Sequence, residues 1–229
     1  MPEFRRPAHR RVAQLLQSLD AELLLSSECF FGGGTQLSLA YGEYRESRDV
    51  DFLCSSRAGF RKLRECVTQT SLGGILRKPL PLAREVRADR DGIRTFVLVD
   101  GDRIKFEILL EGRLDLSGEL NSRLGVPVLA TDDAVAGKFL ANTDRGLDES
   151  THARDLIDLA FLATNLGRKA LLPGLQRAEQ AYGIAVRRHL KLTLQAFQAH
   201  RSRSRAWIAS LGVADTAMLR AGLRVLRTL

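Results

Sequence analysis

The sequence predicts an α/β fold followed by a C-terminal helical bundle, and three observations support this prediction. A short apolar run ending at Phe31 leads through three glycines into a helical pattern, as at the junction of a strand and a helix. Residues 95–110 form the clearest hairpin of the chain, with an Asp-Gly turn between two alternating strands. After residue 131 most of the chain has helical periodicity. We therefore expect one domain in residues 1–130 and a helical domain in residues 131–229.

The N-terminal domain is expected to combine helices and strands. Residues 8–20 have apolar side chains at the i, i+3, i+4 and i+7 positions of an amphipathic helix. The first strand is expected within residues 23–31. A helix is expected over residues 58–72, where the pair of glycines at 73–74 ends it. Residues 83–88 alternate weakly, which favours a further strand before the hairpin.

The C-terminal domain is expected to be helical after an extended segment at residues 126–129. Its helices are expected over residues 134–142, 153–163, 170–181, 184–200 and 215–229. The segment 200–205, His-Arg-Ser-Arg-Ser-Arg, is predicted to be a basic loop. Trp207 follows it, and arginines beside an aromatic ring suit phosphate contact with base stacking. A single Trp is, however, more often a core residue.

Composition excludes several classes of protein. Of the 229 residues, 45% are hydrophobic and 27% charged, which is typical of a globular protein with a buried core. No run of about 18 apolar residues is present, and the basic N-terminus lacks the apolar region of a secretory signal. We therefore expect no membrane span and no membrane partner. Three cysteines without a Cys-x-x-Cys pair indicate reduced thiols in a cytoplasmic protein, and the scattered histidines do not favour a zinc site.

Positive charge is concentrated towards the C-terminal end of the chain. Residues 1–166 have 23 Lys and Arg against 25 Asp and Glu, a net charge of −2. Residues 167–229 have 12 against 2, a net charge of +10, so that the whole chain carries +8. This asymmetry indicates a polyanionic partner, most simply a nucleic acid, while a well-solvated helical tail is the alternative.

The glycine turn and two aspartates that follow it predict a site for a phosphorylated ligand. Gly33 and Gly34 let backbone N–H groups come close to a phosphate, and the helix that Thr35 opens offers unpaired N–H donors. Asp49 and Asp51 lie two residues apart in a predicted strand, so both carboxylates are expected to project from one face. Two neighbouring carboxylates repel each other unless a cation lies between them, and Mg²⁺ prefers such hard oxygen ligands. This combination is typical of phosphoryl or nucleotidyl transfer.

The same motifs resemble those of the nucleotidyltransferases of the polymerase β superfamily. The resemblance consists of Gly33-Gly34-Thr35, thirteen further residues, and then Asp49-Val50-Asp51. Within the superfamily, the chain is most similar to the AbiEii/AbiGii toxin group. The resemblance implies a polymerase-β-like core with a mixed sheet, a triphosphate on the Gly-Gly-Thr turn, and Mg²⁺ (or Mn²⁺) bound by the two aspartates. The alternative is a Gly-rich turn before two solvated aspartates on an edge strand.

A third carboxylate is expected from the hairpin. In the superfamily it often comes from a strand beside the Asp-x-Asp strand, and Glu107 is the candidate here. Lys105 and Glu107 share one face of the returning strand, opposite the apolar Ile104 and Phe106. The resemblance therefore makes Glu107 a candidate catalytic residue and metal ligand. The alternative is a solvent-facing Lys/Glu pair, and the toxin group does not always retain this position.

A second part of the resemblance lies in the C-terminal domain. The toxin group has a lysine-containing helix followed by a helix with an Asp-x-x-Asp signature, represented here by Lys138 and by Asp155 and Asp158. The i, i+3 spacing lets both aspartates face one cleft. The resemblance implies that Lys138 binds and neutralises the triphosphate, and that Asp155 orients this lysine or acts as a base towards the attacking hydroxyl. The role of Asp158 stays open.

These features predict a nucleotidyltransferase that moves a nucleoside monophosphate from an NTP to an acceptor hydroxyl. By resemblance it is the toxin of a toxin–antitoxin or abortive-infection system, with RNA, in particular tRNA, as acceptor and an antitoxin protein encoded nearby as partner. One alternative is an enzyme that modifies a small molecule, in the manner of aminoglycoside nucleotidyltransferases. Another is an inactive relative that holds nucleic acid on its basic tail, but the intact Asp-x-Asp argues against it.

Overall fold

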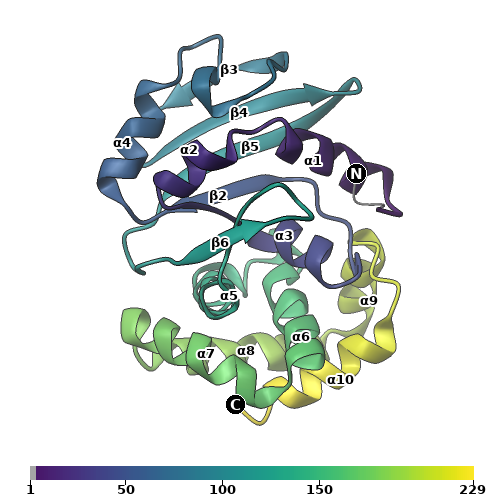
Figure 1. The fold of residues 1–229 in the computed structure, drawn as a ribbon. Coiled ribbons are helices and arrows are strands. Elements are labelled where there is room, and N and C mark those ends of the chain that lie inside the picture. The colour runs from purple at the N-terminus through teal and green to yellow at the C-terminus, as the bar shows by residue number, and fades with distance from the viewer. Residues whose placement is uncertain (1–3) are drawn as a thin grey trace. The chain divides into compact units, whose positions relative to one another are not determined.

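A computed structural model describes residues 4–229 and divides them into two compact units (Figure 1). The first unit contains residues 4–39 and 47–130, and the second contains residues 40–46 and 131–229. The chain thus leaves the first unit shortly after the Gly-Gly-Thr motif and returns to it just before the Asp-x-Asp motif. The residues in between lie in a segment that was expected to belong to the N-terminal domain.

The first unit is built on a seven-stranded mixed sheet (Figure 1). Its strands are β1 (Cys29–Gly32), β2 (Val50–Cys54), β3 (Leu82–Ala88), β4 (Gly92–Val99), β5 (Asp102–Leu110), β6 (Gly118–Asn121) and β7 (Val126–Leu129). They are arranged in the order β3-β4-β5-β2-β1-β7-β6. Neighbouring strands are antiparallel except in the pairs β2–β5 and β1–β7, which are parallel. The expected mixed α/β fold is therefore confirmed.

One face of this sheet carries the hydrophobic core of the unit. In β5, Ile104, Phe106 and Ile108 are fully or almost fully buried, whereas the alternating Lys105 and Glu107 are partly exposed. The helices of the unit are α1 (Pro7–Gln17), α2 (Ala21–Ser26), α3 (Gly33–Ala40) and α4 (Arg57–Glu65), with a 3₁₀ turn, η1, at Gly73–Ile75. Leucines of α1 and α2 join the core cluster of the strands, and Figure 1 shows both helices in front of the sheet.

Some element boundaries in this unit differ from those expected. The strand expected within residues 23–31 begins only at Cys29, and residues 21–26 form helix α2, which the Asp20 side chain caps by accepting a hydrogen bond from the Leu23 N–H. Helix α4 ends at Glu65, well before residue 72, because the following backbone turns and pairs with β3 through Gln69. Strand β6 is too short to show the alternation that predicts a strand.

The second unit is helical. Its helices are α5 (Thr131–Arg145), α6 (Arg154–Leu166), α7 (Arg168–Tyr182), α8 (Ala185–Ala199), α9 (Arg201–Ser210) and α10 (Thr216–Leu226), with a 3₁₀ turn, η2, at Glu149–Thr151. Residues 155–163 of α6 are all buried. Helix α10 crosses α6 so closely that a Cβ on Gly222 would overlap the carbonyl oxygen of Ala160. None of the described helices is both long and apolar enough to cross a bilayer.

The basic segment 200–205 begins helix α9 and is not the loop that its composition favours. Arg203 pairs with Glu149 and lies over the Trp207 ring, 5.3 Å from the ring centroid. His152 also stacks on this ring, with 6.3 Å between centroids. Trp207 and Arg203 therefore make internal contacts of the second unit, and Trp207 is partly exposed.

Candidate active site

The glycine turn joins strand β1 to helix α3. Strand β1 ends at Gly32 and α3 begins at Gly33, whose φ of +74° lies in the left-handed region. A Cβ on Gly33 would lie 2.9 Å from the Oδ2 atom of Asp51. The missing side chain therefore makes room for the Asp51 carboxylate beside the first residue of the helix. This places a negative charge where a helix N-terminus offers N–H donors.

Gly34 and Thr35 follow as the second and third residues of α3. Gly34 is partly exposed, so its backbone is accessible to a ligand. Thr35 is buried, and its hydroxyl forms a 2.7 Å hydrogen bond with the hydroxyl of Ser47. Its side chain thus ties α3 to the segment that enters β2.

The two aspartates of the Asp-x-Asp motif differ in their structural setting. Asp51 lies within β2, whereas Asp49 precedes Val50, the first residue of that strand. The strand is thus shorter at its start than expected, and pairing within the sheet fixes only the direction of Asp51. Both side chains are partly exposed, in contrast to the buried Val50 and Phe52.

Glu107 occupies the position expected for a third carboxylate. Strands β2 and β5 are parallel, Asp51 and Glu107 are register partners, and partners on neighbouring strands project to one face. However, the Glu107 carboxylate is already paired: Lys105 Nζ lies 2.5 Å from Oε2 and Arg94 Nε lies 3.6 Å from Oε1. The expected alternative of a Lys/Glu pair is thus present, and a role for Glu107 as metal ligand stays a prediction.

The donors near Gly33 fit a magnesium ion that also binds a phosphorylated substrate. In phosphoryl-transfer sites, Mg²⁺ commonly takes one or two protein carboxylates and completes its shell with phosphate oxygens and waters. Asp49 and Asp51 are two such carboxylates, and Asp51 adjoins the start of α3. Within residues 4–229, no group of three or more His, Cys, Asp or Glu side chains is arranged to hold a metal. Two carboxylates leave the remaining positions of such a shell to phosphate oxygens and waters.

In the second unit, Lys138 of α5 forms ion pairs with both aspartates of α6. Its Nζ lies 2.9 Å from Asp155 Oδ1 and 2.6 Å from Asp158 Oδ2. All three residues are buried, and the most exposed of them, Lys138, exposes only 5% of its surface. An ammonium group has three hydrogens, and among the described residues only these two carboxylates accept from it. One donor of Lys138 is thus left for a ligand.

The segment 40–46 is tied to the same cluster through Asp158. Arg45 Nε and Nη2 donate to the two Asp158 oxygens at 2.6 and 2.9 Å, the bidentate geometry that makes such pairs strong. The Tyr44 hydroxyl donates to Asp158 Oδ1 at 2.7 Å, and burial raises its pKa, which keeps it protonated as a donor. The Tyr44 ring stacks on Phe161, with 4.2 Å between centroids. These contacts explain why this segment belongs to the second unit.

Arg145, at the end of α5, completes the cluster. Its Nε donates to Asp155 Oδ2 at 2.8 Å. The cluster thus contains three cations, Arg45, Lys138 and Arg145, and two anions, Asp155 and Asp158, so these five side chains sum to +1. Arg145 is the most exposed of these cations, with 41% of its side chain accessible, whereas Arg45 and Lys138 are buried.

Both aspartates of the cluster remain ionised at neutral pH. Burial alone would raise the pKa of Asp155, but Lys138 and Arg145 outweigh burial and hold that pKa well below its usual value. The pKa of Asp158 is lowered in the same way, by Arg45 and Lys138 acting against burial. Because a carboxylate with such a low pKa is a poor proton acceptor, the geometry favours Asp155 as the residue that orients Lys138 over Asp155 as a base.

Tyr44, Arg45 and Arg145 do not belong to any motif that the sequence displays. Tyr44 and Arg45 lie in a polar segment without periodicity, and Arg145 is one of many arginines in the chain. The sequence of α6 does indicate that Asp158 has a charged partner, because Asp158 lies among apolar residues on every side of the helix. A carboxylate in that setting is buried and requires a cation. The pattern predicts the need for a partner, but it does not say which residue provides it.

The predicted site residues fall into two groups, each assembled within one unit. The first unit contains Gly33, Gly34, Thr35, Asp49, Asp51 and Glu107. The second contains Lys138, Asp155 and Asp158. A single active site formed by both groups stays a prediction.

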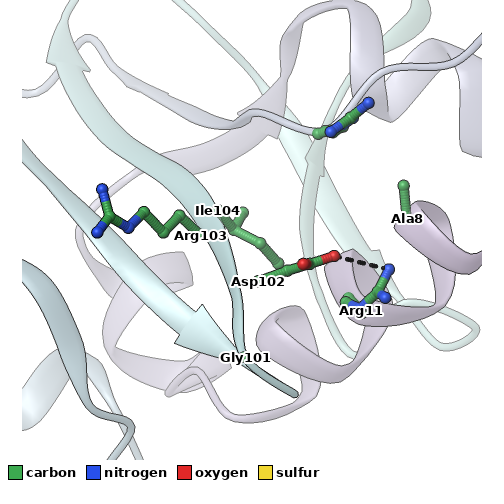
Figure 2. Close-up of a pocket in the computed structure, with 7 residues that line it drawn as sticks. Ala8, Arg11, Gly101, Asp102, Arg103 and Ile104 are labelled. Atoms are coloured by element: carbon green, nitrogen blue, oxygen red, sulfur yellow. Dashed lines mark ion pairs between the residues drawn. The ribbon is translucent and has the colours of Figure 1, made fainter.

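A cavity of about 400 Å³ in the first unit has several arginines in its lining (Figure 2). The residues that line it are Ala8, Arg11, Arg48, Gly101, Asp102, Arg103 and Ile104. Arg11 pairs with Asp102 at 3.0 Å, and Figure 2 shows the Arg103 side chain pointing away from this pair. The charge of Arg11 is thus offset by Asp102 within the lining, and the Arg103 side chain is directed away from this pair.

Comparisons with known proteins identify the family. The chain matches a family model described as the nucleotidyl transferase AbiEii toxin of type IV toxin–antitoxin systems, over residues 14–220. No curated protein sequence matches the chain significantly.

Two solved structures from Helicobacter pylori have a similar fold. One is a candidate nucleotidyltransferase with 17% identity and a TM-score of 0.54, covering 96% of this chain and 92% of that one. The other, JHP933, has 16% identity and a TM-score of 0.54, covering 99% of this chain and 93% of that one. At such identities the likeness shows the fold alone, and it agrees with the expected nucleotidyltransferase core. Because the family model spans most of the sequence, including both groups of site residues, the chain belongs to the AbiEii nucleotidyl transferase toxin family of type IV toxin–antitoxin systems.

Proposed function

We propose that this protein is a Mg²⁺-dependent toxin that transfers a nucleoside monophosphate from an NTP to a hydroxyl group of RNA, with cytoplasmic tRNA as the acceptor. The observation that carries the proposal is the position of the Asp51 carboxylate against Gly33, at the start of α3. A carboxylate suited to Mg²⁺ thus adjoins backbone donors suited to phosphate. Family membership supplies the reaction type and the expectation of an antitoxin partner.

In this proposal, residues of the first unit bind the triphosphate. The backbone N–H groups of Gly33 and Gly34 donate to phosphate oxygens, and Asp49 and Asp51 bind Mg²⁺. When bound, the ion neutralises charge on the phosphates and on the leaving pyrophosphate. Glu107, the register partner of Asp51, holds Lys105 and Arg94 through its two ion pairs.

Lys138 has the second role, as a fixed positive charge for the triphosphate. Asp155 and Asp158 hold its ammonium group from two sides, so it needs no reorganisation when a substrate binds. Its remaining hydrogen donates to a phosphate oxygen. Each aspartate also keeps a guanidinium partner, Arg45 or Arg145, when Lys138 donates to the substrate.

The reaction is an in-line displacement at the α-phosphorus. The acceptor hydroxyl oxygen forms a bond to that phosphorus, the bond to the bridging oxygen breaks, and pyrophosphate leaves with the bonding electron pair. The hydroxyl proton is released to a buffer base in the solvent, and Asp155 is not assigned as the base because its lowered pKa makes it a poor proton acceptor. Positioning and charge stabilisation supply the catalysis.

The matched family model spans both groups of residues, and this supports the proposal that they act on one substrate. In this proposal Asp49 and Asp51 bind the metal and Lys138 neutralises charge on the same triphosphate.

The test is transfer of label from each α-³²P-labelled NTP in turn, with Mg²⁺ and three acceptors: purified tRNA, RNA depleted of tRNA, and a small-molecule extract. The proposal expects labelled tRNA, with no label when EDTA is present or when Asp51→Asn replaces the native protein. Expression of the native protein, but not of Asp51→Asn, is expected to stop growth. Label only in small molecules would support the aminoglycoside-like alternative, and no label with any acceptor would overturn the proposal.

A further inference from the structure

The sheet of the first unit has a second face, opposite its core, that is rich in positive charge. We define the open face as the side chains of β3, β4 and β5 that point away from the core cluster. Its cationic and aromatic members are Arg84, Arg87, Arg94, Phe96, Arg103 and Lys105, and Glu107 is an acidic member. The ion pairs of Arg94 and of Lys105 with the same carboxylate, on Glu107, confirm that residues of β4 and β5 share this face.

Strand register arranges these side chains in two rows across the sheet. The first row runs Arg87, Arg94, Glu107 and then Asp51, each residue being the register partner of the next. Arg87 and Asp51 are three strands apart, which is roughly 14 Å at the spacing of neighbouring strands. The row therefore connects the exposed edge strand β3 with a carboxylate of the proposed active site.

The second row runs Arg84, Phe96 and Lys105. Phe96 is a half-buried aromatic side chain between two cations. Aromatic rings flanked by cations are the arrangement on which single-stranded nucleic acids stack their bases while their phosphates contact the charges.

Positive charge on the open face is only partly offset. Arg94 pairs with Asp89 at 3.0 Å and with Glu107, which also pairs with Lys105. The remaining arginines, Arg84, Arg87 and Arg103, are exposed, and among residues 4–229 none of them has an acidic partner. Three guanidinium groups without an acidic partner thus lie on one face of the sheet, where they suit an extended polyanion better than a single phosphate group.

We propose that the open face binds the single-stranded end of the RNA acceptor and directs its hydroxyl towards Asp51. This rests on the proposed function for the chemistry at Asp51, but the binding surface itself follows from register and charge. Bases stack on Phe96, and phosphates contact Arg84, Arg87 and Arg103. The surface differs from the basic C-terminal helices, where Arg203 is already paired with Glu149.

The test compares two triple variants that remove the same charge from the first unit. Arg84→Gln/Arg87→Gln/Arg103→Gln alters the open face, and Arg57→Gln/Arg61→Gln/Arg64→Gln alters exposed arginines of α4. Binding of a short fluorescein-labelled single-stranded RNA is followed by anisotropy between about 50 and 200 mM salt. The open-face variant is expected to lower the log–log salt slope by about 2, the value for three contacts to a single strand, while the α4 variant leaves it unchanged.

Phe96→Leu provides an uncharged check. It keeps an apolar side chain but removes the ring, so it is expected to weaken RNA binding about fivefold or more without changing the salt slope. With saturating NTP, the open-face variant is also expected to raise KM for RNA and to leave kcat unchanged. Melting temperatures near that of the native protein establish that each variant is folded.

The outcomes separate this proposal from the proposed function, because binding is measured without NTP. Equal slopes for the two triple variants would overturn the open face, even if the native protein labels tRNA. A salt slope that falls only in the variant Arg201→Gln/Arg203→Gln/Arg205→Gln would also overturn the proposal, because the RNA would then bind at α9. A salt slope that is lowered only in the open-face variant supports RNA binding at the open face, even if the native protein transfers no nucleotide.

Discussion

Lys138 Nζ lies 2.9 Å from Asp155 Oδ1 and 2.6 Å from Asp158 Oδ2, so one ammonium group joins two carboxylates of the same helix. Neither aspartate depends on Lys138 alone. Asp155 also pairs with Arg145, and Asp158 also pairs with Arg45. Loss of the lysine therefore leaves each buried carboxylate with a guanidinium partner, which separates the effect on activity from the effect on folding.

We expect Lys138→Ala to reduce nucleotide transfer by ~10²–10³, the scale for loss of one preorganised electrostatic group. The free energy of unfolding is expected to fall by only about 1–3 kcal/mol, because the lost hydrogen bonds leave no unpaired charge. Lys138→Arg recovers only part of the activity, since a planar guanidinium cannot replace a compact ammonium. Single-turnover transfer and urea denaturation measure the two effects. A loss of activity below about twofold in folded Lys138→Ala would remove this residue from the site.

Gly33→Ala tests the packing of Asp51 against the start of α3. The substitution strains a backbone with φ of +74° and brings a Cβ to 2.9 Å from the Asp51 carboxylate. Gly101→Ala is the matched control, because its φ is +82° but no atom lies within 4 Å of the added Cβ. Both are expected to cost about 1–2 kcal/mol of stability. Only Gly33→Ala is expected to lower transfer by about 10²-fold, through displacement of Asp51; equal activities would argue against this contact.

Asp155 is expected to make stability depend on pH at the acid end. Its pKa in the folded protein lies below the ordinary value of 3.8, so the unfolded chain binds a proton more readily than the folded one. The stabilisation is thus complete above that ordinary value and is lost as the pH falls towards the folded pKa. Asp155→Asn is expected to flatten the acid limb of the free energy of unfolding against pH. Asp132→Asn, at an exposed position on α5, serves as the control, and an unchanged acid limb in Asp155→Asn would contradict the prediction.

The fold and the main motifs are predictable because they depend on local patterns. The glycine turn, the Asp-x-Asp strand and the hairpin are each defined by residues close together in sequence, and the family resemblance joins them. Helix α2 is missed because one capping side chain, Asp20, decides against a strand in an apolar stretch that fits both. The basic segment of α9 is missed because helix propensity outweighs the loop-like composition.

The partners of the buried charges are not predictable in the same way. The apolar surroundings of Asp158 in α6 predict that this carboxylate requires a cation as partner. That partner, Arg45, lies 113 residues away in an irregular segment. The open face depends on irregular pairing of β3 with β4, with register shifts between Leu82 and Arg84 and between Arg84 and Arg87. Strict alternation would place Arg84 and Arg87 on opposite faces. Such long-range or irregular contacts carry no periodic signal in a single sequence.

The assignment of Asp51 and Lys138 to one active site is tested by combining their substitutions. Residues that act on the same transition state as one unit give losses that do not add, whereas independent sites give free energies that add within about 0.5 kcal/mol. We expect Asp51→Ala to abolish all but residual transfer, and Asp51→Ala/Lys138→Ala to be scarcely slower than Asp51→Ala alone. The fold of Asp51→Ala is expected to hold, because repulsion from Asp49 is relieved.

Lys138→Ala combined with Arg57→Gln is the control pair, since Arg57 on α4 has no role in the site. Single-turnover transfer from α-labelled NTP is sensitive enough for the residual rates. If the double variant instead loses the full product of the two single losses, the two groups of residues do not share a substrate.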